Sequence, residues 1–249
     1  MKTAFITGAS SGIGRATAVA LAKSGFQLIL AGRRRERLET LAQELAPTPV
    51  HLLTFDVRER AAVETAVSEL PAEFAHVDVL INNAGNAHGL APIQDGDVAD
   101  WDAMLDGNVK GLLYVSRAVL PRMGEGGIIV NLGSIAGYEA YANGNVYCAS
   151  KAAVAMLTRT MRIDLLPRGI RVAEVAPGMV ETEFSEVRFK GDEERAANVY
   201  KGVEPLQAAD IADVIQFIVT RPPHVQLAEV VVFPAAQAAA TTVKRASQG

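Results

Sequence analysis

A tyrosine and a lysine lie four residues apart where a helix is expected to begin, in the run NGNVYCASKAAVAMLTRTMR. At this spacing Tyr147 and Lys151 share one helix face, one turn apart. A neighbouring cation favours the phenolate form of a phenol, so the pair is a candidate for proton transfer. The same spacing also occurs by chance on exposed helices. The rest of the chain must decide between the two interpretations.

A glycine-rich turn, TGASSGIG at residues 7–14, follows the first expected strand and opens the first expected helix. Gly8, Gly12 and Gly14 allow a tight turn, close approach of a ligand and close helix packing. The helix start offers free N–H groups and a partial positive charge to a pyrophosphate. The spacing is G-x-x-x-G-x-G, not the G-x-G-x-x-G of many dinucleotide enzymes. We predict a dinucleotide site here, with contacts from Gly8, Ser10, Ser11, Gly12, Ile13 and Gly14.

A basic run, AGRRRERL, follows the second expected strand. A carboxylate at this point would bind the adenosine ribose and indicate NAD, but the sequence has Gly32 followed by Arg33, Arg34 and Arg35. Cations at a helix start oppose the helix dipole, so helix stability does not explain them. Arginines pair well with a 2′-phosphate, which favours NADP, with Arg33 and Arg34 as its contacts. The alternative is a solvated basic turn.

An aspartate, Asp56, ends the third expected strand in the run FDVR. We predict that its carboxylate and the N–H of Val57 contact the adenine. The alternative is that Asp56 is the N-cap of the next helix, and the two roles are compatible.

Short apolar runs alternate with amphipathic stretches along almost the whole chain. The apolar runs are mostly continuous, as expected for parallel strands that are covered on both faces. Alternation of strands and helices predicts a doubly wound parallel α/β sheet in a single domain over residues 1–249. The expected strands are TAFIT, FQLILAG, VHLLTFD, VDVLINN, GIIVNL, IRVAEVAP and AEVVVFP, and the expected helices cover residues 12–24, 34–45, 58–70, 98–123, 145–167 and 207–220.

Two segments depart from this alternation. Residues 180–203 are polar and lie between the sixth expected strand and the last helix. They are interpreted as a substrate lid or as a solvated loop. The small and polar tail at 235–249 is interpreted as a subunit contact or as a frayed terminus.

The composition narrows the function classes. The chain has 249 residues, is 49% hydrophobic and carries a net charge of −4, and its basic residues form no stripe that would bind nucleic acid. One cysteine cannot form an internal disulfide, and the four histidines have no zinc-like spacing, so we expect no metal. No apolar run is long enough to span a bilayer, and the N-terminus does not look like a signal peptide. We expect a cytoplasmic protein without nucleic-acid or membrane partners.

Six motifs occur in order: TGASSGIG, NNAG at 82–85, Asn108 in GNVKG, Ser134 in GSIAG, YCASK, and PG at 177–178. Together they resemble the motifs of the short-chain dehydrogenase/reductase family, and the resemblance covers essentially the whole chain. It implies a Rossmann-type domain with a seven-stranded sheet and a Ser–Tyr–Lys centre with a helical asparagine.

The resemblance also implies roles for these residues. Tyr147 would be the general acid or base, and Lys151 would favour its ionisation and bind the nicotinamide ribose. Ser134 would hydrogen-bond the reacting oxygen, and Asn108 would hold a water that links Lys151 to solvent. The structural alternatives are a turn-capping serine and a helix-bending asparagine. Further cofactor contacts are implied at Asn83, Ala84, Gly85, Pro177, Gly178, Val180 and Thr182.

The segment TEFSEVRFKGD at 182–192, with AGRRRERL and GNVYCASK, is similar to the NADP-dependent 3-hydroxy acid dehydrogenases. That group oxidises the 3-hydroxyl of serine, allo-threonine and related short acids, including 3-hydroxypropionate. A small acid is bound mainly through its anionic end, for which Arg188 and Lys190 are the candidates. The alternative is that both are solvated loop cations.

Two other functions stay open on the sequence alone. One is reduction of another small carbonyl, such as sulfoacetaldehyde, malonic semialdehyde or a 3-oxoacyl ester. The other is a non-catalytic module that senses NADPH, which would not need Ser134, Tyr147 and Lys151. The family resemblance further implies a homotetramer, assembled through the two long helices expected at 98–123 and 145–167.

Overall fold

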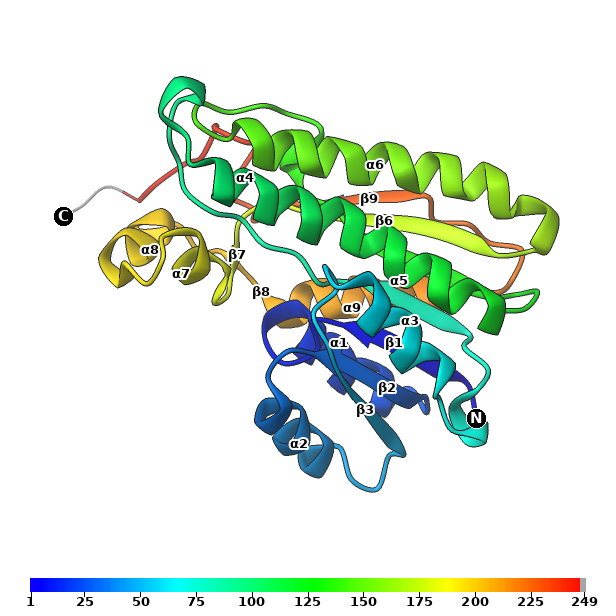
Figure 1. The fold of residues 1–249 in the computed structure, drawn as a ribbon. Helices are drawn as coiled ribbons and strands as arrows, with labels where there is room; N and C mark the ends of the chain where they lie inside the picture. Colours follow the sequence, from blue (N-terminus) through cyan, green and yellow to red (C-terminus); the bar gives the residue numbers. More distant parts are fainter. Residues whose placement is uncertain (247–249) are drawn as a thin grey trace.

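The computed structural model describes residues 1–246, apart from the side chains at positions 193, 196 and 197. A sheet of seven parallel strands forms its centre, in the order β3-β2-β1-β4-β5-β6-β9 (Figure 1). Its strands are β1 (Thr3–Thr7), β2 (Gln27–Gly32), β3 (Val50–Thr54), β4 (Val79–Asn82), β5 (Ile128–Leu132), β6 (Arg171–Pro177) and β9 (Glu229–Val232).

Helices cover both faces of this sheet (Figure 1). One face carries α1 (Gly12–Lys23), α2 (Arg35–Glu44) and α9 (Ala208–Val219). The other carries α3 (Arg60–Ser68), α5 (Gly111–Val119) and α6 (Asn145–Leu165). The single helix expected over 98–123 is α4 (Val98–Leu105), a π-helical turn at Asp106–Lys110 and α5. The doubly wound parallel sheet predicted from the sequence is confirmed.

The strands are mostly apolar because the central ones pack on two helical layers. Phe5 of β1 packs in the layer of α3, α5 and α6, whereas Ala4 and Ile6 pack in the layer of α1, α2 and α9. All three side chains are fully buried. The chain reverses its strand order between β1 and β4, and in such sheets the loops at the carboxyl ends diverge at this point to form a crevice.

A row of polar side chains interrupts the apolar sheet on four adjacent strands. Asn82 of β4 is in register with Asn131 of β5, which is in register with Glu174 of β6, and Glu174 with Glu229 of β9. The first three are buried. The Asn82 Nδ2 donates to Asn131 Oδ1 at 2.9 Å, and the Tyr138 hydroxyl donates to Glu174 Oε2 at 2.8 Å.

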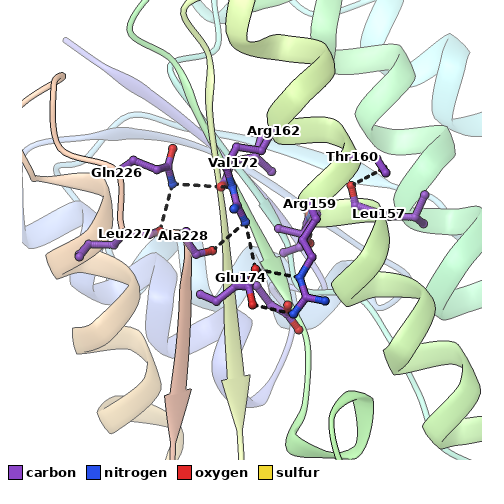
Figure 2. Close-up of polar contacts among 12 residues, drawn as sticks. Leu157, Arg159, Thr160, Arg162, Val172, Glu174, Gln226, Leu227 and Ala228 are labelled. Carbon is purple, nitrogen blue, oxygen red and sulfur yellow. Dashed lines mark hydrogen bonds and ion pairs between the residues drawn. The ribbon is translucent and has the colours of Figure 1, made fainter.

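Helix α6 is attached to this polar row. Asn131 Nδ2 donates to Thr158 Oγ1 at 2.9 Å in the buried interface. At the β9 side, Arg159 lies 2.8 Å and Arg162 3.3 Å from the Glu229 carboxylate, and Figure 2 shows the two arginines reaching from α6 toward β6 and β9. Since a buried polar group is costly without its partner, these bonds hold α6 at one place along the sheet.

The polar excursion at 180–203 folds into two short helices. It contains β7 (Val180–Glu181), which pairs with β8 (Leu206–Gln207), and the helices α7 (Phe184–Arg188) and α8 (Glu193–Tyr200). The alternative of a solvated loop is therefore wrong, because short amphipathic helices are hard to recognise in a segment of this composition. We call residues 180–203 the lid segment.

The tail is ordered as far as it is described. Gln237 and Val243 form an antiparallel bridge, and the N–H of Ala246 donates to the Gly202 carbonyl at 2.8 Å. Arg245 and Ala246 thus bond to the lid segment of the same chain, and the interpretation of this part as a frayed terminus is wrong. The interpretation of the tail as a subunit contact stays a prediction, and residues 247–249 lie outside the description.

Among the described residues, no helix combines the length and the apolar character that crossing a membrane requires.

We expect that Gly14→Ala destabilises the protein. A Cβ at this position would lie 2.4 Å from the Gly8 carbonyl oxygen and 2.5 Å from Asn83 Nδ2, so backbone must move to admit it. Overpacking of this kind costs about 1–3 kcal/mol, measurable by urea unfolding. Gly124→Ala is the control, because its Cβ would meet only His76 Cε1 at an ordinary 3.4 Å. Equal stability of both variants would contradict the packing described for the glycine turn.

Candidate active site

One cavity of about 780 Å³ lies at the carboxyl ends of the sheet strands and under the lid segment. It is bordered at one end by the arginines that follow β2 and at the other by Tyr147. The residues predicted from the sequence that line it are Gly8, Ser10, Ser11, Gly12, Ile13, Arg33, Arg34, Asp56, Val57, Asn83, Ala84, Gly85, Ser134, Tyr147, Lys151, Pro177, Gly178, Val180, Thr182 and Arg188.

The glycine turn brings backbone to the cavity wall. The Asn83 amide donates to the carbonyls of Thr7 and Gly8 at 2.9 and 3.2 Å, which fixes the turn against the end of β4. Gly14 is buried beneath the turn and supplies the close helix packing expected of it. Helix α1 begins at Gly12 without a side-chain cap from Ser11, so the N–H groups of its first turn are available to an anion.

The arginine end of the cavity is already engaged in hydrogen bonds. The Arg34 guanidinium donates to Ser11 Oγ at 2.7 Å, to Ser10 Oγ at 3.3 Å and to Glu183 Oε2 at 2.9 Å. Arg37 binds the other oxygen of Glu183. Burial raises the pKa of the Glu183 carboxyl, but the bonds from Arg37 and Arg34 outweigh burial and hold it below its ordinary value.

Asp56 is held by arginines at the same end of the cavity. Its carboxylate lies 2.7 Å from Arg58 and 3.9 Å from Arg33, and Oδ1 accepts the N–H of Arg58 at 3.0 Å. Helix α3 starts only at Arg60, with Glu59 at its N-cap, so the N-cap alternative for Asp56 is wrong. The adenine contact of Asp56 and Val57 stays a prediction.

These features fit a dinucleotide that carries a 2′-phosphate. The uncapped helix start suits a pyrophosphate, and Arg33 and Arg34 border the end of the same cavity. At the other end Asn83, Ala84, Gly85, Pro177 and Gly178 line the approach to Tyr147. A bound NADP supplies the hydride acceptor or donor of an oxidoreductase.

Tyr147 and Lys151 lie buried on one face of α6, as their spacing predicts. The Lys151 Nζ donates to the Leu132 carbonyl at 2.9 Å and lies 6.0 Å from the centroid of the Tyr147 ring. Burial raises the pKa of Tyr147 to about 12, against the opposing effects of the Arg188 guanidinium and the Ser134 hydroxyl. Burial also lowers the pKa of Lys151 to about 8, and Glu174 opposes this change.

A second positive charge, from a residue other than Lys151, lies close to Tyr147. Arg188, the last residue of α7, places its Cζ 4.8 Å from the centroid of the Tyr147 ring. Its Nη2 donates to the Tyr141 hydroxyl at 2.6 Å, and its buried Nε has no hydrogen-bond partner among the described residues. The Arg188 guanidinium therefore lowers the pKa of the phenol, against the larger effect of burial.

Lys190, the second cation expected to bind substrate, lies elsewhere. Its Nζ lies 2.9 Å from the Asp100 carboxylate and 3.5 Å from that of Asp97. The ammonium ion thus ties the lid segment to the start of α4 and is neutralised there, which gives no support to a contact with substrate.

Ser134 and Asn108 both make hydrogen bonds that fit their structural alternatives, a turn-capping serine and a helix-bending asparagine. Ser134 Oγ accepts the N–H of Ala136 at 3.2 Å and caps a short 3₁₀ turn. Asn108 lies in the π-helical turn, where its amide binds the backbone of Asn86 at 2.7 and 2.9 Å and donates to Ser150 Oγ at 3.0 Å. Ser134 still borders the cavity and remains able to bind a substrate oxygen. The water role of Asn108 stays a prediction.

Three residues at the site were not predicted. Glu183 and Tyr141 line the cavity and bind Arg34 and Arg188, respectively. Gln237 is buried and accepts the N–H of Met179 at 2.9 Å, which supports the loop after β6. Glu183 belongs to the TEF stretch noticed in the sequence, but nothing local indicates its partner. A lone glutamine in a tail of small residues gives no signal either.

The arrangement suits proton transfer to or from the oxygen of a small substrate whose neighbouring carbon is oxidised or reduced. A buried phenol with a raised pKa is protonated at neutral pH and can donate its proton to a carbonyl oxygen. Ser134 can hydrogen-bond the same oxygen as its charge develops. Arg188 can pair with an anion next to Tyr147.

Comparison with known proteins agrees with this chemistry. A family model described as short chain dehydrogenase matches residues 2–193. The chain is 48% identical to sulfoacetaldehyde reductase 2 of Chromohalobacter salexigens over 94% of both chains. It is 46% identical to the NADP-dependent 3-hydroxy acid dehydrogenase of Schizosaccharomyces pombe over 98% of this chain and 96% of the relative. A solved closed form of serine dehydrogenase complexed with NADP⁺ superposes with a TM-score of 0.92 at 38% identity, covering 99% and 100% of the two chains.

We expect Lys151→Met to stabilise the folded protein at pH 7. Below pH 8 the lysine is protonated both folded and unfolded, so folding carries the full cost of burying an ammonium ion. Between about pH 8 and pH 10.5, the ordinary pKa of lysine, the folded lysine is mostly neutral while the unfolded one is still protonated. The cost of burial therefore disappears as the pH rises through this range. The gain at pH 7 is on the order of 2–3 kcal/mol and shrinks toward pH 10.

Denaturant unfolding at pH 7, 8.5 and 10 measures this gain. Lys201→Met, which removes an exposed lysine, serves as the control without a pH-dependent gain. A Lys151→Met gain that is the same at every pH would show that burial of the ammonium ion is not its source.

Proposed function

The chain belongs to the short-chain dehydrogenase family and is an NADP-dependent oxidoreductase, and we propose that it acts on short 3-hydroxy acids. In this proposal it transfers a hydride between the carbon that bears the 3-hydroxyl and the cofactor. The observation that carries the proposal is Arg188: a guanidinium 4.8 Å from the Tyr147 ring centroid, with a buried Nε that lacks a partner among the described residues. The sensing alternative is set aside, because the relatives are named as dehydrogenases and reductases.

The roles of the residues follow from their chemistry. Arg188 binds the carboxylate of the substrate and so places the 3-hydroxyl near Tyr147. In oxidation Tyr147 accepts the hydroxyl proton while Ser134 hydrogen-bonds the same oxygen. Because burial raises the pKa of Tyr147 to about 12, the phenol is in its acid form at neutral pH. Reduction can therefore begin from this form, whereas oxidation requires deprotonation and should accelerate as the pH rises.

The charges that line the cavity favour some hydroxy acids over others as substrates. Its lining carboxylates among the described residues are Asp56 and Glu183, and both are paired with arginines at the phosphate end. The ammonium group of serine would find neither of them free beside Arg188. We therefore favour acids without an amino group, such as 3-hydroxypropionate, over serine and allo-threonine.

Reduction of sulfoacetaldehyde is the second candidate. The relative of 48% identity carries that name, and a sulfonate presents the same anionic end to Arg188 as a carboxylate does. A neutral 3-oxoacyl ester would leave Arg188 without a partner and is less well supported. Assays with 3-hydroxypropionate, serine and allo-threonine plus NADP, and with sulfoacetaldehyde and malonic semialdehyde plus NADPH, separate these candidates.

We propose that the protein is a homotetramer. Exposed apolar side chains on α6 and directly after it support this proposal. Met156, Ile163 and Leu166 are 56%, 72% and 74% exposed. Leu166 follows directly after the end of α6. We expect light scattering to give four times the chain mass of 26.4 kDa, and Ile163→Glu with Leu166→Glu to lower it. A monomeric mass for the unaltered protein would contradict the proposal.

We expect Arg188→Ala to raise the KM for 3-hydroxypropionate by about ten- to a hundredfold, because a charged hydrogen bond to the substrate is lost. The matched control is Lys190→Ala, which removes a cation two positions away that is paired with Asp97 and Asp100. This control should leave KM within about twofold.

A second readout tests the effect of Arg188 on Tyr147. Loss of the guanidinium raises the pKa of the phenol further, so the rise of the oxidation rate with pH should move to higher pH in Arg188→Ala. An unchanged KM would overturn the substrate assignment. An unchanged pH profile would show that Arg188 does not control the phenol.

A further inference from the structure

We propose that Glu183 is a cofactor-specificity residue: its carboxylate holds Arg34 and Arg37 until a 2′-phosphate displaces it, and this exchange releases α7 from α2. The inference depends on the use of NADP and is independent of which substrate the enzyme oxidises or reduces.

The first observation is the place of this ion pair in the fold. Glu183 precedes α7, and its Oε2 lies 2.9 Å from Nη1 of Arg34, which precedes α2 and is 149 residues away in the sequence. Arg37, in the first turn of α2, binds the second carboxylate oxygen. The lid segment is thereby tied through one carboxylate to the helix that follows β2.

The second observation is that the carboxylate binds an arginine that is expected to bind the 2′-phosphate. Glu183 borders the same cavity as Ser10, Ser11, Arg33 and Arg34. Arg34 already donates to Ser11 at 2.7 Å and to Glu183 at 2.9 Å, so its strongest donors are committed. A 2′-phosphate that binds Arg34 must therefore compete with Glu183, because two anions that share one guanidinium repel each other.

The competition distinguishes the two nicotinamide cofactors. NADP brings a phosphate that replaces the carboxylate as the partner of Arg34. NAD brings an uncharged 2′-hydroxyl, which cannot displace a carboxylate from two arginines. This hydroxyl can instead donate a hydrogen bond to the carboxylate. Glu183 therefore weakens the binding of NADPH and has little effect on that of NADH, and only the phosphorylated cofactor frees the start of α7.

The first experiment measures dissociation constants for NADPH and NADH by their fluorescence, with Glu183→Gln and the unaltered protein. We expect Glu183→Gln to tighten NADPH binding by about five- to tenfold and to change NADH binding by less than about twofold. Glu181→Gln is the matched control: Glu181 lies in the same segment but bonds to Gln207 instead of an arginine, so neither constant should change. Weaker NADPH binding, or an equal change for both cofactors, would overturn the proposal.

The second experiment follows α7 directly by hydrogen exchange of the backbone amides at 184–190. Adenosine 2′,5′-bisphosphate, which carries the phosphate without the nicotinamide, should speed this exchange in the unaltered protein, and AMP should not. In Glu183→Gln the exchange should already be fast, and the bisphosphate should add nothing. If saturating bisphosphate leaves α7 unchanged in the unaltered protein, the claim that the phosphate releases the lid segment is wrong.

Discussion

The position of α6 along the sheet is the constraint on which the active site depends. A register-aligned row of polar side chains crosses β4, β5, β6 and β9, and α6 is bonded to it through Thr158 and through two arginines on Glu229. The loop after β5 is bonded to the same row, because the Tyr138 hydroxyl donates to Glu174. Tyr147 and Lys151 on the helix and Ser134 on the loop are therefore placed relative to one another by buried hydrogen bonds.

Burial moves the two titratable groups of this site in opposite directions, and both toward their neutral forms. The pKa of Tyr147 rises to about 12 and that of Lys151 falls to about 8. A low-dielectric site of this kind disfavours any isolated charge, so charges brought by Arg188, by the cofactor and by the substrate act strongly there. The acidity of Tyr147 consequently depends on the charged groups that enter the site, and among the described residues on Arg188.

The sequence was informative wherever a local pattern reports a local requirement. Continuous apolar runs identified all seven strands of the sheet, and the glycine turn and the YCASK spacing located two walls of the cavity. It was uninformative where a contact joins distant segments. The pair of Glu183 with Arg34 spans 149 residues and has no periodicity, and the contact of Gln237 with Met179 is of the same kind. Residues 180–203 were recognised as a departure from the strand–helix alternation, but their two helices were not, because their length provides too few turns for a hydrophobic period.

Helix α7 is only five residues long, with an anion just before it and a cation at its end. Glu183 is paired with Arg34 and Arg37, and Arg188 lies against the Tyr147 ring. Only one turn of helix separates these two groups, so we expect a shift at one end to reach the other. If the two proposed roles hold, cofactor and substrate change each other's binding free energy by the same amount. Under these proposals, one turn of helix couples the recognition of the two reactants.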